Sequence, residues 1–307
     1  MSGRIALIGF GEAGRTFAGA AGWRSDARAF DLKAIEPQTA APIRAAYTET
    51  GVTGCESLAD ALAGAEMILS LVTADQTEAA ASAAARHLSP GALFFDMNSV
   101  SPGAKMRNAA AIEQAGGRYV DVAVMSPVQP AAMTVPLLIG GPHAAQGEAA
   151  LRAIGFSKVT IAGDQVGAAS ATKMVRSVMI KGIEALTAEM ILAARRAGVT
   201  ENVLASLGGD WPEKIDYNLD RMLAHGTRRA AEMDEVVVTL TELGIEPAMT
   251  RGTVARQRAM GALLGSIEMP QGLEAKLAFL DAMHPEMIAK PVSAAQPKIT
   301  ETEKSGR

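Results

Sequence analysis

Cysteine is almost absent from this 307-residue chain, aromatic residues make up only 4% of it, and basic residues do not outnumber acidic ones. The one cysteine, Cys55, cannot form an internal disulfide, which is typical of proteins from a reducing compartment. The first residues lack the apolar core and cleavage site of a signal peptide, and no apolar run approaches the roughly 18 residues of a membrane span. We therefore expect a soluble, cytoplasmic protein with no membrane partner.

The charge balance and the histidines exclude two more classes of protein. There are 29 Lys and Arg residues against 33 Asp and Glu residues, so no basic excess points to a nucleic-acid partner. The four histidines are far apart and have no second ligand at metal-binding spacing, so we expect no metal site. With 49% hydrophobic residues, the chain can form one large domain or two ordinary ones.

The most informative segment lies near the N-terminus, where an apolar run leads into Gly9-x-Gly11-x-x-Gly14 and then into a helical pattern. A strand, a tight glycine turn and a helix in this order form the fingerprint of dinucleotide binding. Gly9 permits the turn, Gly11 lets the backbone approach a pyrophosphate, and Gly14 lets the helix pack on the strand. The helix N-terminus offers free N–H groups to the phosphates. The expected cofactor contacts of this loop are Gly9, Phe10, Gly11, Glu12, Ala13 and Gly14.

An acidic residue follows at the distance typical of this fingerprint. Segment 27–31 reads as a second strand that ends in Asp31, 17 residues after Gly14. A carboxylate there accepts hydrogen bonds from the adenosine ribose and repels a 2′-phosphate, so NAD is favoured over NADP. Lys33 softens that preference and keeps NADP open, and Asp31 is also a common residue at an ordinary strand end.

The first half of the chain alternates short apolar runs with Ala-rich amphipathic stretches, which predicts a mostly parallel, doubly wound sheet. We expect strands at 4–9, 28–32, 66–72, 92–96, 118–122, 135–140 and 157–161. After Val166 the pattern is helical, with a long helix over 167–197 and further helices at 201–207, 212–224, 227–243, 247–264 and 270–283.

These patterns predict an α/β fold class with an N-terminal Rossmann domain and an all-α C-terminal domain. The predicted domains are a dinucleotide-binding domain at 1–164 and a helical substrate and dimerisation domain at 165–284, opened by the long helix. About 30 helical residues span roughly 45 Å, a length typical of a scaffold or a subunit interface. The tail 285–307 is rich in Pro, Lys, Glu and Ser and is predicted to be extended or disordered.

Three further motifs accompany the glycine fingerprint. Segment 96–102 reads Asp-Met-Asn-Ser-Val-Ser-Pro, segment 121–128 reads Asp-Val-Ala-Val-Met-Ser-Pro-Val, and the long helix opens with Gly167 followed six residues later by Lys173. With these four motifs, residues 3–265 resemble the β-hydroxyacid dehydrogenase superfamily, which includes 3-hydroxyisobutyrate, tartronate semialdehyde and 6-phosphogluconate dehydrogenases. The resemblance is nearest to a 6-phosphogluconate-dehydrogenase-like branch with its own type of C-terminal domain.

The resemblance assigns roles to the first two of these motifs. The family reads Asp-x-Ser-Thr-x-Ser-Pro at 96–102, which implies that Asn98 and Ser99 lie near the nicotinamide ribose. Val72 and Thr73, at the end of another predicted strand, are further expected cofactor contacts. Alternatively, Ser99 or Ser101 caps a helix that starts at Pro102, and both readings can hold together.

At 121–128 the family usually reads Asp-Ala-Pro-Val-Ser-Gly-Gly and contacts the substrate carboxylate. Here Met125, Ser126 and Pro127 replace Ser-Gly-Gly, and Pro127 has no N–H to offer. The resemblance still implies substrate contacts from Met125 and from the Ser126 hydroxyl, although not in the usual manner.

In the fourth motif the family reads Gly-x-Gly-x-x-x-Lys-x-x-Asn-Asn, so Lys173 matches the catalytic lysine. Ser177 replaces the second Asn, one turn further on the same helix face, where it can bond a substrate oxygen. Decarboxylating 6-phosphogluconate enzymes have a Glu seven residues after the lysine, and Ile180 stands there in this chain. We read this as evidence against decarboxylation.

The lysine chemistry requires a special environment. A free lysine has a pKa near 10.4, and burial beside the cofactor would lower it toward the range of a general acid or base. A lysine on a helix is more often solvated. The expectation of a crowded apolar setting for Lys173 rests on its neighbours Ala168, Ala169, Ala171, Met174 and Val175.

On the substrate side, segment 225–235 falls where the family has a Lys-Asp-Leu helix that faces the active site, but the Lys is missing. Arg228 and Arg229 are candidates to bind an acidic substrate, and a solvated charged face is the alternative. Trp211 and Tyr217 either line a pocket or pack in the core.

The resemblance therefore implies an NAD(P)-dependent dehydrogenase or reductase acting on the CH–OH group of a small, acidic 3-hydroxyacid-like substrate or on its carbonyl form. It also implies a homodimer through the helical domain. Imine reduction on the same scaffold is an alternative, which Lys173 disfavours because such enzymes commonly lack it. A non-catalytic NAD(P)-binding regulator and a methyltransferase using S-adenosylmethionine are alternatives from other classes.

Overall fold

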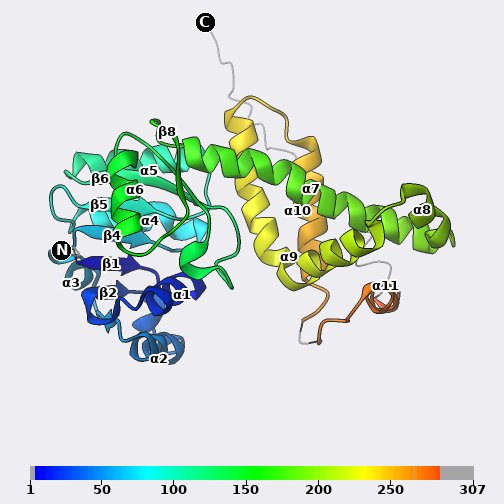
Figure 1. Ribbon diagram of the computed structural model, residues 1–307, viewed down its shortest axis with the longest axis horizontal. Helices are drawn as coiled ribbons and strands as arrows, with labels where there is room; N and C mark the ends of the chain where they lie inside the picture. The colour runs from blue at the N-terminus through cyan, green and yellow to red at the C-terminus, as the bar shows by residue number, and fades with distance from the viewer. Residues whose placement is uncertain (1–3, 266, 284–307) are drawn as a thin grey trace, which may run out of the picture. The chain divides into compact units, whose positions relative to one another are not determined.

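The computed structural model describes residues 4–265 and 267–283, and the chain divides into two compact units (Figure 1). Of the described residues, one unit comprises those up to Lys181 together with Ala231–Thr250, and the other comprises Gly182–Ala230 and those from Arg251 onward. Helices α7 (Ala168–Arg196) and α9 (Trp211–Glu242) contribute residues to both units. The domain boundary at 164/165 stays a prediction, and the predicted tail 285–307 lies outside the described residues.

The first unit contains one eight-stranded sheet with the strand order β3-β2-β1-β4-β5-β6-β7-β8. Neighbouring strands are parallel except for the antiparallel pair β6–β7, so the mostly parallel, doubly wound sheet is confirmed. The order reverses between β1 and β4, which is where open α/β sheets bind their ligands. The strands are β1 (Ile5–Ile8), β2 (Ala27–Phe30), β3 (Thr53–Gly54), β4 (Met67–Ser70), β5 (Leu93–Asp96), β6 (Arg118–Val124), β7 (Leu137–Gly140) and β8 (Val159–Gly163).

The edge strand β3 was not predicted because it has only two residues, one of them glycine, and no apolar run marks it. The other strands are found where alternation of apolar and helical segments placed them. In the interior strands β1 and β4 every residue is buried, since helices cover both faces of the sheet.

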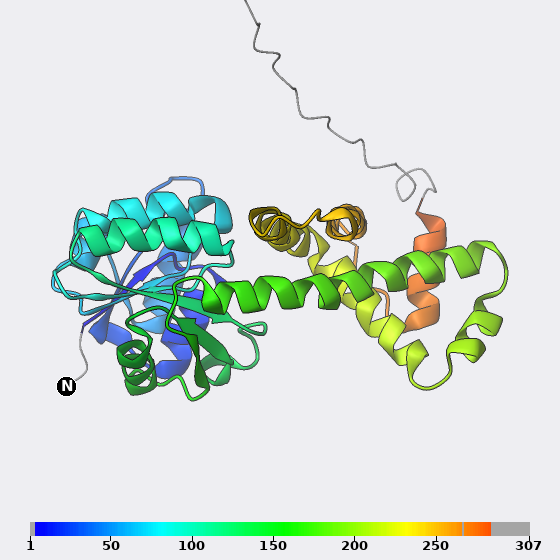
Figure 2. The ribbon, with the colours of Figure 1, turned by 90° about the horizontal axis from the view of Figure 1, so that it is seen from above.

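Each face of the sheet has its own layer of helices (Figure 2). On one face, α1 (Glu12–Ala21), α2 (Ala40–Thr50) and α6 (Ala144–Ala153) pack over a core that includes Phe17, Ile43 and Leu151. On the other, α3 (Leu58–Leu62), α4 (Thr77–Ala85) and α5 (Pro102–Gln114) bury a second core that includes Leu62 and Ile112. These layers leave the carboxyl ends of β1, β2, β4, β5 and β6 uncovered together. This end of the sheet, where these strands terminate, is called the carboxyl edge below.

Among the described residues, every regular element after Gly163 is helical, as predicted. The 29-residue helix α7 is about 43 Å long at 1.5 Å per residue. The second unit also contains α8 (Thr200–Leu207), α11 (Leu273–Ala282) and most of α10 (Ala248–Gly261). Its core is built from α7, α9, α10 and α11, with Ile191, Leu219, Met260 and Leu277 at its centre.

The prediction of two helices at 212–224 and 227–243 was wrong, because α9 runs unbroken from Trp211 to Glu242. Gly226, which the pattern assigned to a break, lies inside the helix. A Cβ at this position would overlap the backbone of Gln257 and Gly261 in α10. The glycine therefore serves a close helix–helix approach, which in sequence looks the same as a helix boundary.

Candidate functional site

The glycine loop between β1 and α1 has the geometry that a bound pyrophosphate requires. Gly9 has φ +90°, and a Cβ there would lie 2.6 Å from the carbonyl oxygen of Leu71. A Cβ at Gly14 would lie 2.9 Å from the carbonyl oxygen of Gly9, so this glycine allows the helix to approach the strand. A Cβ added at Gly11 would have no neighbouring atom within 4 Å, and Gly11 has no side chain to cap the N-terminus of α1. The first turn of α1 thus presents its N–H groups to open space.

Asp31 lies directly beside this loop, at the carboxyl end of β2. Its Oδ2 accepts a hydrogen bond from the backbone N–H of Phe10 at 2.7 Å, and its Oδ1 accepts one from Lys33 N–H at 2.8 Å. The carboxylate therefore links the glycine loop to the end of the second strand. It is half-buried and lies at the strand end beside which dinucleotide-binding folds bind the adenosine ribose.

The ends of β4 and β5 form the next part of the same edge. Asn98 is 4% exposed, and its Nδ2 donates to Ser70 Oγ at 3.0 Å and to Asp96 Oδ1 at 2.8 Å. Its Oδ1 has no hydrogen-bond partner among the described residues, so a buried acceptor is left available at this edge. Val72 and Thr73 follow β4, and Val72 Cγ1 would lie 3.2 Å from a Cβ at Gly9. Ser101 caps α5 by accepting from Ala104 N–H at 3.3 Å, which confirms one of the two predicted caps.

Lys173 in the second turn of α7 reaches this edge. Its Nζ donates a hydrogen bond to Ser99 Oγ at 2.5 Å, across 74 residues of sequence. Ser177, one turn further, donates to the carbonyl oxygen of Lys173 and accepts from the ammonium of Lys181 at 3.2 Å. Lys181 is only 6% exposed and pairs with Glu232 at 2.9 Å. One face of α7 thus carries two lysines and a serine in an i, i+4, i+8 row.

Met125 and Ser126 lie at the carboxyl end of β6, at the same edge. Met125 N–H donates to the carbonyl oxygen of Pro136 at 2.9 Å, and the carbonyl oxygen of Met125 accepts from Arg176 at 3.4 Å. The hydroxyl of Ser126 is turned to the carbonyl oxygen of Pro127. Arg176 occupies the place of the family's first Asn, and the sequence motif alone gave it no role.

Arg228 and Arg229 belong to the second unit and differ from each other. Arg228 is exposed, whereas Arg229 is 7% exposed and forms a buried ion pair with Glu184. Gln257 Nε2 donates to the same carboxylate at 2.7 Å. The substrate role of both arginines stays a prediction. Of the two aromatic residues, Tyr217 is 61% exposed and therefore does not pack in the core, while Trp211 is partly buried.

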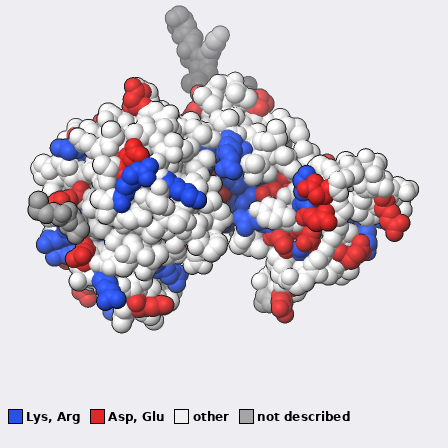
Figure 3. Space-filling model, in the orientation of Figure 1, with Lys and Arg blue, Asp and Glu red and all other residues white. Residues whose placement is uncertain are grey.

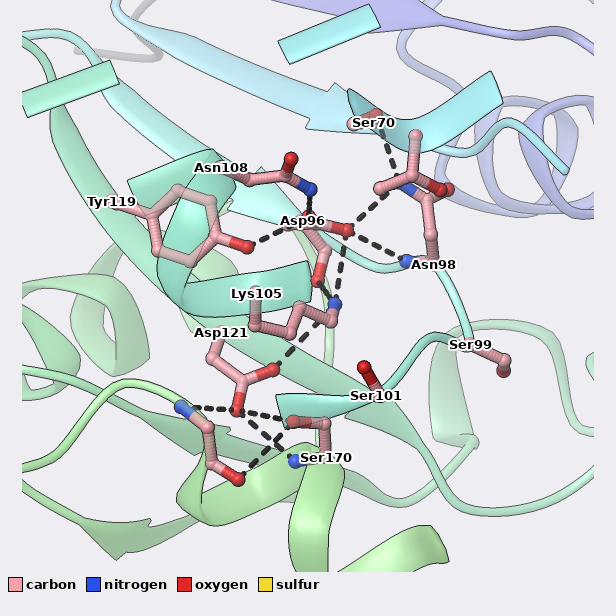
Figure 4. A network of polar contacts seen from close by, with 12 residues as sticks. Ser70, Asp96, Asn98, Ser99, Ser101, Lys105, Asn108, Tyr119, Asp121 and Ser170 are labelled. Atoms are coloured by element: carbon pink, nitrogen blue, oxygen red, sulfur yellow. Dashed lines mark hydrogen bonds and ion pairs between the residues drawn. The ribbon is translucent and has the colours of Figure 1, made fainter. Parts of the chain in front are cut away.

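A buried polar cluster that the sequence motifs did not predict lies beneath this edge (Figure 4). Lys105 is fully buried between Asp96 and Asp121, which lie at the corresponding positions of β5 and β6. Burial alone would raise the pKa of the Asp96 carboxyl. Its contacts with Lys105, Tyr119 and Asn108 outweigh burial and hold this pKa below its usual range. Burial and the adjacent Asp96 raise the pKa of Tyr119 well above its usual value.

A signal for this cluster is present in the sequence. The buried positions of α5 follow the helical spacing 104, 105, 108, 109 and 112, and two of them are the polar residues Lys105 and Asn108. A charged residue on the sheet-facing side of a helix needs a partner, and the aspartates of the two neighbouring strands, Asp96 and Asp121, are candidates.

Two glutamates from α9 approach the N-terminus of α5. Glu235 Oε2 accepts from Ser101 N–H at 2.8 Å, and Glu242 accepts from the Ser101 hydroxyl and from Gly103 N–H, each at 3.3 Å. Negative charge is favourable at a helix N-terminus. Burial raises the pKa of Glu235, the Ser101 N–H lowers it, and Glu242 raises it further, with a net upward shift.

Within residues 4–265 and 267–283, no group of three or more His, Cys, Asp or Glu side chains is arranged to hold a metal ion. No helix in this part of the chain is both long and apolar enough to cross a membrane. On the face that Figure 3 shows, Lys and Arg side chains are interspersed with Asp and Glu.

Two family models match the chain. The NAD binding domain of 6-phosphogluconate dehydrogenase matches residues 4–163, and a domain of unknown function, DUF1932, matches residues 194–260. The first match covers just over half of the chain, so the protein belongs to the family with the NAD binding domain of 6-phosphogluconate dehydrogenase. The glycine fingerprint thus marks an NAD-binding domain, as predicted.

Solved structures extend the comparison to most of the chain. A conserved hypothetical protein from Sinorhizobium meliloti is 38% identical and has a TM-score of 0.75, with 91% of this chain and 96% of that chain covered. A conserved protein of unknown function, described as structurally similar to 3-hydroxyacid dehydrogenases, is 29% identical, with a TM-score of 0.65 and 84% and 99% covered. The 3-hydroxyisobutyrate dehydrogenase of Mycobacterium tuberculosis, solved with L-serine, is 17% identical, with a TM-score of 0.70 and 92% and 100% covered. The last likeness shows the fold alone, and the β-hydroxyacid dehydrogenase resemblance is confirmed at that level.

Proposed function

We propose that the protein is an NAD(P)-dependent oxidoreductase that interconverts a small 3-hydroxyacid and its carbonyl form, with Lys173 as the general acid and base. The observation that carries this proposal is the hydrogen bond from Lys173 Nζ to Ser99 Oγ at 2.5 Å. It holds a half-buried amine at the carboxyl edge of the sheet, next to the strand ends that face the dinucleotide in this fold.

The residues around the glycine loop fit a dinucleotide. The open space at Gly11 and the uncapped N–H groups of α1 suit a pyrophosphate, and Asp31 suits the adenosine ribose hydroxyls. The unpartnered Oδ1 of Asn98 is an acceptor for a hydroxyl or amide group of the nicotinamide end. The cofactor, when bound, supplies the hydride acceptor or donor. NAD is the preferred form, because the Asp31 carboxylate disfavours a 2′-phosphate.

Lys173 performs the proton transfer in this proposal. In alcohol oxidation its neutral amine accepts the hydroxyl proton, and in carbonyl reduction its ammonium donates a proton to the developing alkoxide. Ser99 Oγ fixes the direction of the amine, and Ser177 offers a hydroxyl to a substrate oxygen one helical turn away. Met125 and Ser126 border the substrate position at the end of β6.

The first test is differential scanning fluorimetry with NAD⁺, NADH, NADP⁺ and NADPH, followed by absorbance assays at 340 nm with a panel of 3-hydroxyacids. A nicotinamide dinucleotide that binds the native state raises the melting temperature. We expect stabilisation by the NAD pair and turnover of at least one hydroxyacid. Lys173→Met should reduce kcat by about 10²–10⁴-fold while NADH binding stays within twofold of wild type.

The matched control is Lys214→Met, which removes an exposed lysine that pairs with Asp210 at the start of α9. It should leave both kcat and NADH binding unchanged. Dinucleotide binding without turnover of any alcohol, carbonyl or imine would favour the regulator instead. Turnover of imines that survives Lys173→Met would favour the imine reductase.

We also propose that the protein is a homodimer through its helical unit. Ile183 and Leu186 on α7 are 40% and 56% exposed, and they border an apolar hollow of about 440 Å³ with Met190 and Trp211. Apolar surface of this kind is rarely left open to water. Leu186→Glu should convert the dimer into a monomer in light scattering after gel filtration, while Leu207→Glu, at an exposed leucine of α8, should not.

A further inference from the structure

The buried lysine Lys105 connects two segments of the proposed site that lie far apart in sequence. Its Nζ donates to the backbone carbonyl oxygen of Asp96 at 2.6 Å and to Asp96 Oδ1 at 2.9 Å, and it lies 3.5 Å from Asp121 Oδ1. All three side chains are fully buried. Figure 4 shows Lys105 between the two carboxylates, each of which extends to a different part of the edge.

The Asp96 branch leads to Ser99. Besides Lys105, Asp96 Oδ1 accepts from the backbone N–H of Asn98 at 3.1 Å and from its Nδ2 at 2.8 Å. Asp96 Oδ2 accepts from Tyr119 Oη and from Asn108 Nδ2, which hold the carboxylate from the other side. The loop that carries Ser99 is therefore fixed to the end of β5 through one charged group.

The Asp121 branch leads to Lys173. Asp121 Oδ2 accepts from the backbone N–H of Gly167 at 3.1 Å, from Ser170 N–H at 3.0 Å and from Ser170 Oγ at 3.2 Å. These donors belong to the start of α7, and Ser170 lies one turn before Lys173. Asp121 Oδ1 has no hydrogen-bond partner among the described residues, so the ammonium of Lys105 is what faces it.

We propose that Lys105 is a positioning residue that sets the approach of Lys173 to Ser99. The contacts form a closed ring. Lys105 binds Asp96, which in turn binds the Asn98–Ser99 loop, and Ser99 accepts a hydrogen bond from Lys173. The start of the helix that carries Lys173 is bound by Asp121, which also lies against Lys105. This inference rests on the proposed function, because it gives a reason for the geometry of the proposed acid and base.

A charged centre suits this task better than an apolar one. Hydrogen bonds to ionised groups are shorter, stronger and more directional than neutral ones. In a fully buried site a misplaced charge is costly, so both carboxylates stay within reach of one ammonium. A change far from the reacting atoms that slightly misplaces a proton-transfer group can reduce turnover about a hundredfold.

The test compares three variants. Asp121→Asn keeps the Lys105–Asp96 pair and nearly the shape of the side chain, and it replaces one acceptor oxygen and the negative charge that hold α7 with a neutral amide. Lys105→Met removes the centre of the ring, and the double variant removes both partners. Each variant is first checked for folding by circular dichroism and for NADH binding by fluorescence titration, since Gly9 to Gly14 and Asp31 are unchanged in all of them.

Two readouts report on the site. The first is the rate at which acetic anhydride labels the Lys173 amine, followed by mass spectrometry and normalised to exposed lysines of the same sample. We expect at least threefold faster labelling in Asp121→Asn and Lys105→Met, because the amine is no longer held against Ser99. The second is kcat, which should fall at least tenfold while KM for the cofactor stays within twofold. The double variant should be no slower than Lys105→Met alone, because both changes break the same link.

The control is a second buried lysine that is also held by two aspartates. Lys276 is 1% exposed and pairs with Asp216 at 2.6 Å and Asp220 at 2.7 Å in the helical unit. Lys276→Met should lower the melting temperature and leave kcat and the labelling of Lys173 unchanged. If Lys105→Met and Asp121→Asn behave in the same way, the proposed positioning role is wrong.

The design separates this inference from the proposed function. If Lys105→Met does not fold, Asp121→Asn decides, because its remaining ion pair is balanced in charge. If wild-type protein oxidises no hydroxyacid, the proposed function fails while the labelling rates still report whether the ring positions Lys173. If wild type is active and both variants keep its kcat and labelling rate within twofold, only the positioning inference fails.

Discussion

Replacing Asp31 is the sharpest single perturbation of the cofactor site, because its carboxylate has two separable tasks. It accepts from the N–H of Phe10, a fully buried residue, and in the proposed function it also binds the adenosine ribose. Asp31→Ala leaves that buried N–H without its acceptor, which costs about 1–3 kcal/mol. For a chain of this size the melting temperature should fall by roughly 2–5 °C. This loss occurs without any ligand.

The ligand contribution has its own magnitude. Hydrogen bonds to a charged group contribute about 1.5–3 kcal/mol, so both Asp31→Ala and Asp31→Asn should weaken NADH binding by roughly 10–150-fold. Asp31→Asn keeps an oxygen that can accept from Phe10 N–H, so its melting temperature without ligand should stay within about 2 °C of wild type. NADPH should bind relatively better to both variants, because the repulsion of its 2′-phosphate is gone.

Fluorescence titration with NADH and NADPH measures both affinities, and scanning fluorimetry without ligand measures the structural cost. Lys33→Ala is the matched control, since its backbone N–H, the group that Asp31 Oδ1 accepts from, is retained. It should keep NADH affinity within threefold. The reasoning would be refuted by NADH affinities of Asp31→Ala and Asp31→Asn that equal wild type within twofold, because Asp31 would then only fasten the glycine loop.

Three further measurements test other parts of the molecule. The pKa of Asp96 is lowered in the folded state, so its charged form stabilises the protein at pH values above the ordinary pKa of 3.8. This stability is lost as the pH falls through the lower pKa of the folded state. In acid unfolding curves, Asp96→Asn should therefore show a shallower loss of stability with falling pH than wild type. The pKa of Glu235 is raised in the folded state, so its protonated form stabilises the protein, fully so at pH values below the ordinary pKa of 4.5. This stability is lost as the pH rises through the pKa of the folded state. Glu235→Gln should therefore raise the melting temperature at pH 7 and leave it unchanged at pH 4. Arg229→Met leaves Glu184 buried without its ion pair and should destabilise the protein by about 3–5 kcal/mol in urea unfolding, whereas Arg228→Met should cost less than about 0.5 kcal/mol.

The sequence predicted those parts of the site that are formed by residues close to one another along the chain. The turn at Gly9, the close approach at Gly14 and the acid at the end of the next strand each follow from local backbone geometry, which a spacing pattern records. Lys173 was predicted from its match to the family motif that begins at Gly167, just before α7. Its hydrogen bond to Ser99 crosses 74 residues, and no local pattern specifies such a contact.

The parts that the sequence could not predict depend on which face of a helix turns inward. Arg228 and Arg229 are adjacent, and successive residues of a helix point about 100° apart, so one is exposed and the other is buried against Glu184. The same ambiguity turned Gly226 into a predicted break, although it lies in an unbroken helix at a close contact with α10. In both cases the deciding partner belongs to another helix.

The two buried lysines show why similar sets of ion pairs can have different consequences. Each is nearly inaccessible to solvent and is held by two aspartates. Asp216 and Asp220 are one turn apart on α9, so Lys276 fastens α11 to a single rigid helix, and its loss can loosen only that contact. Asp96 ends β5 and Asp121 lies within β6, and each accepts hydrogen bonds from a segment that carries a proposed site residue. The effect of removing a buried charge on catalysis therefore depends less on the strength of its ion pairs than on what its partners hold in place.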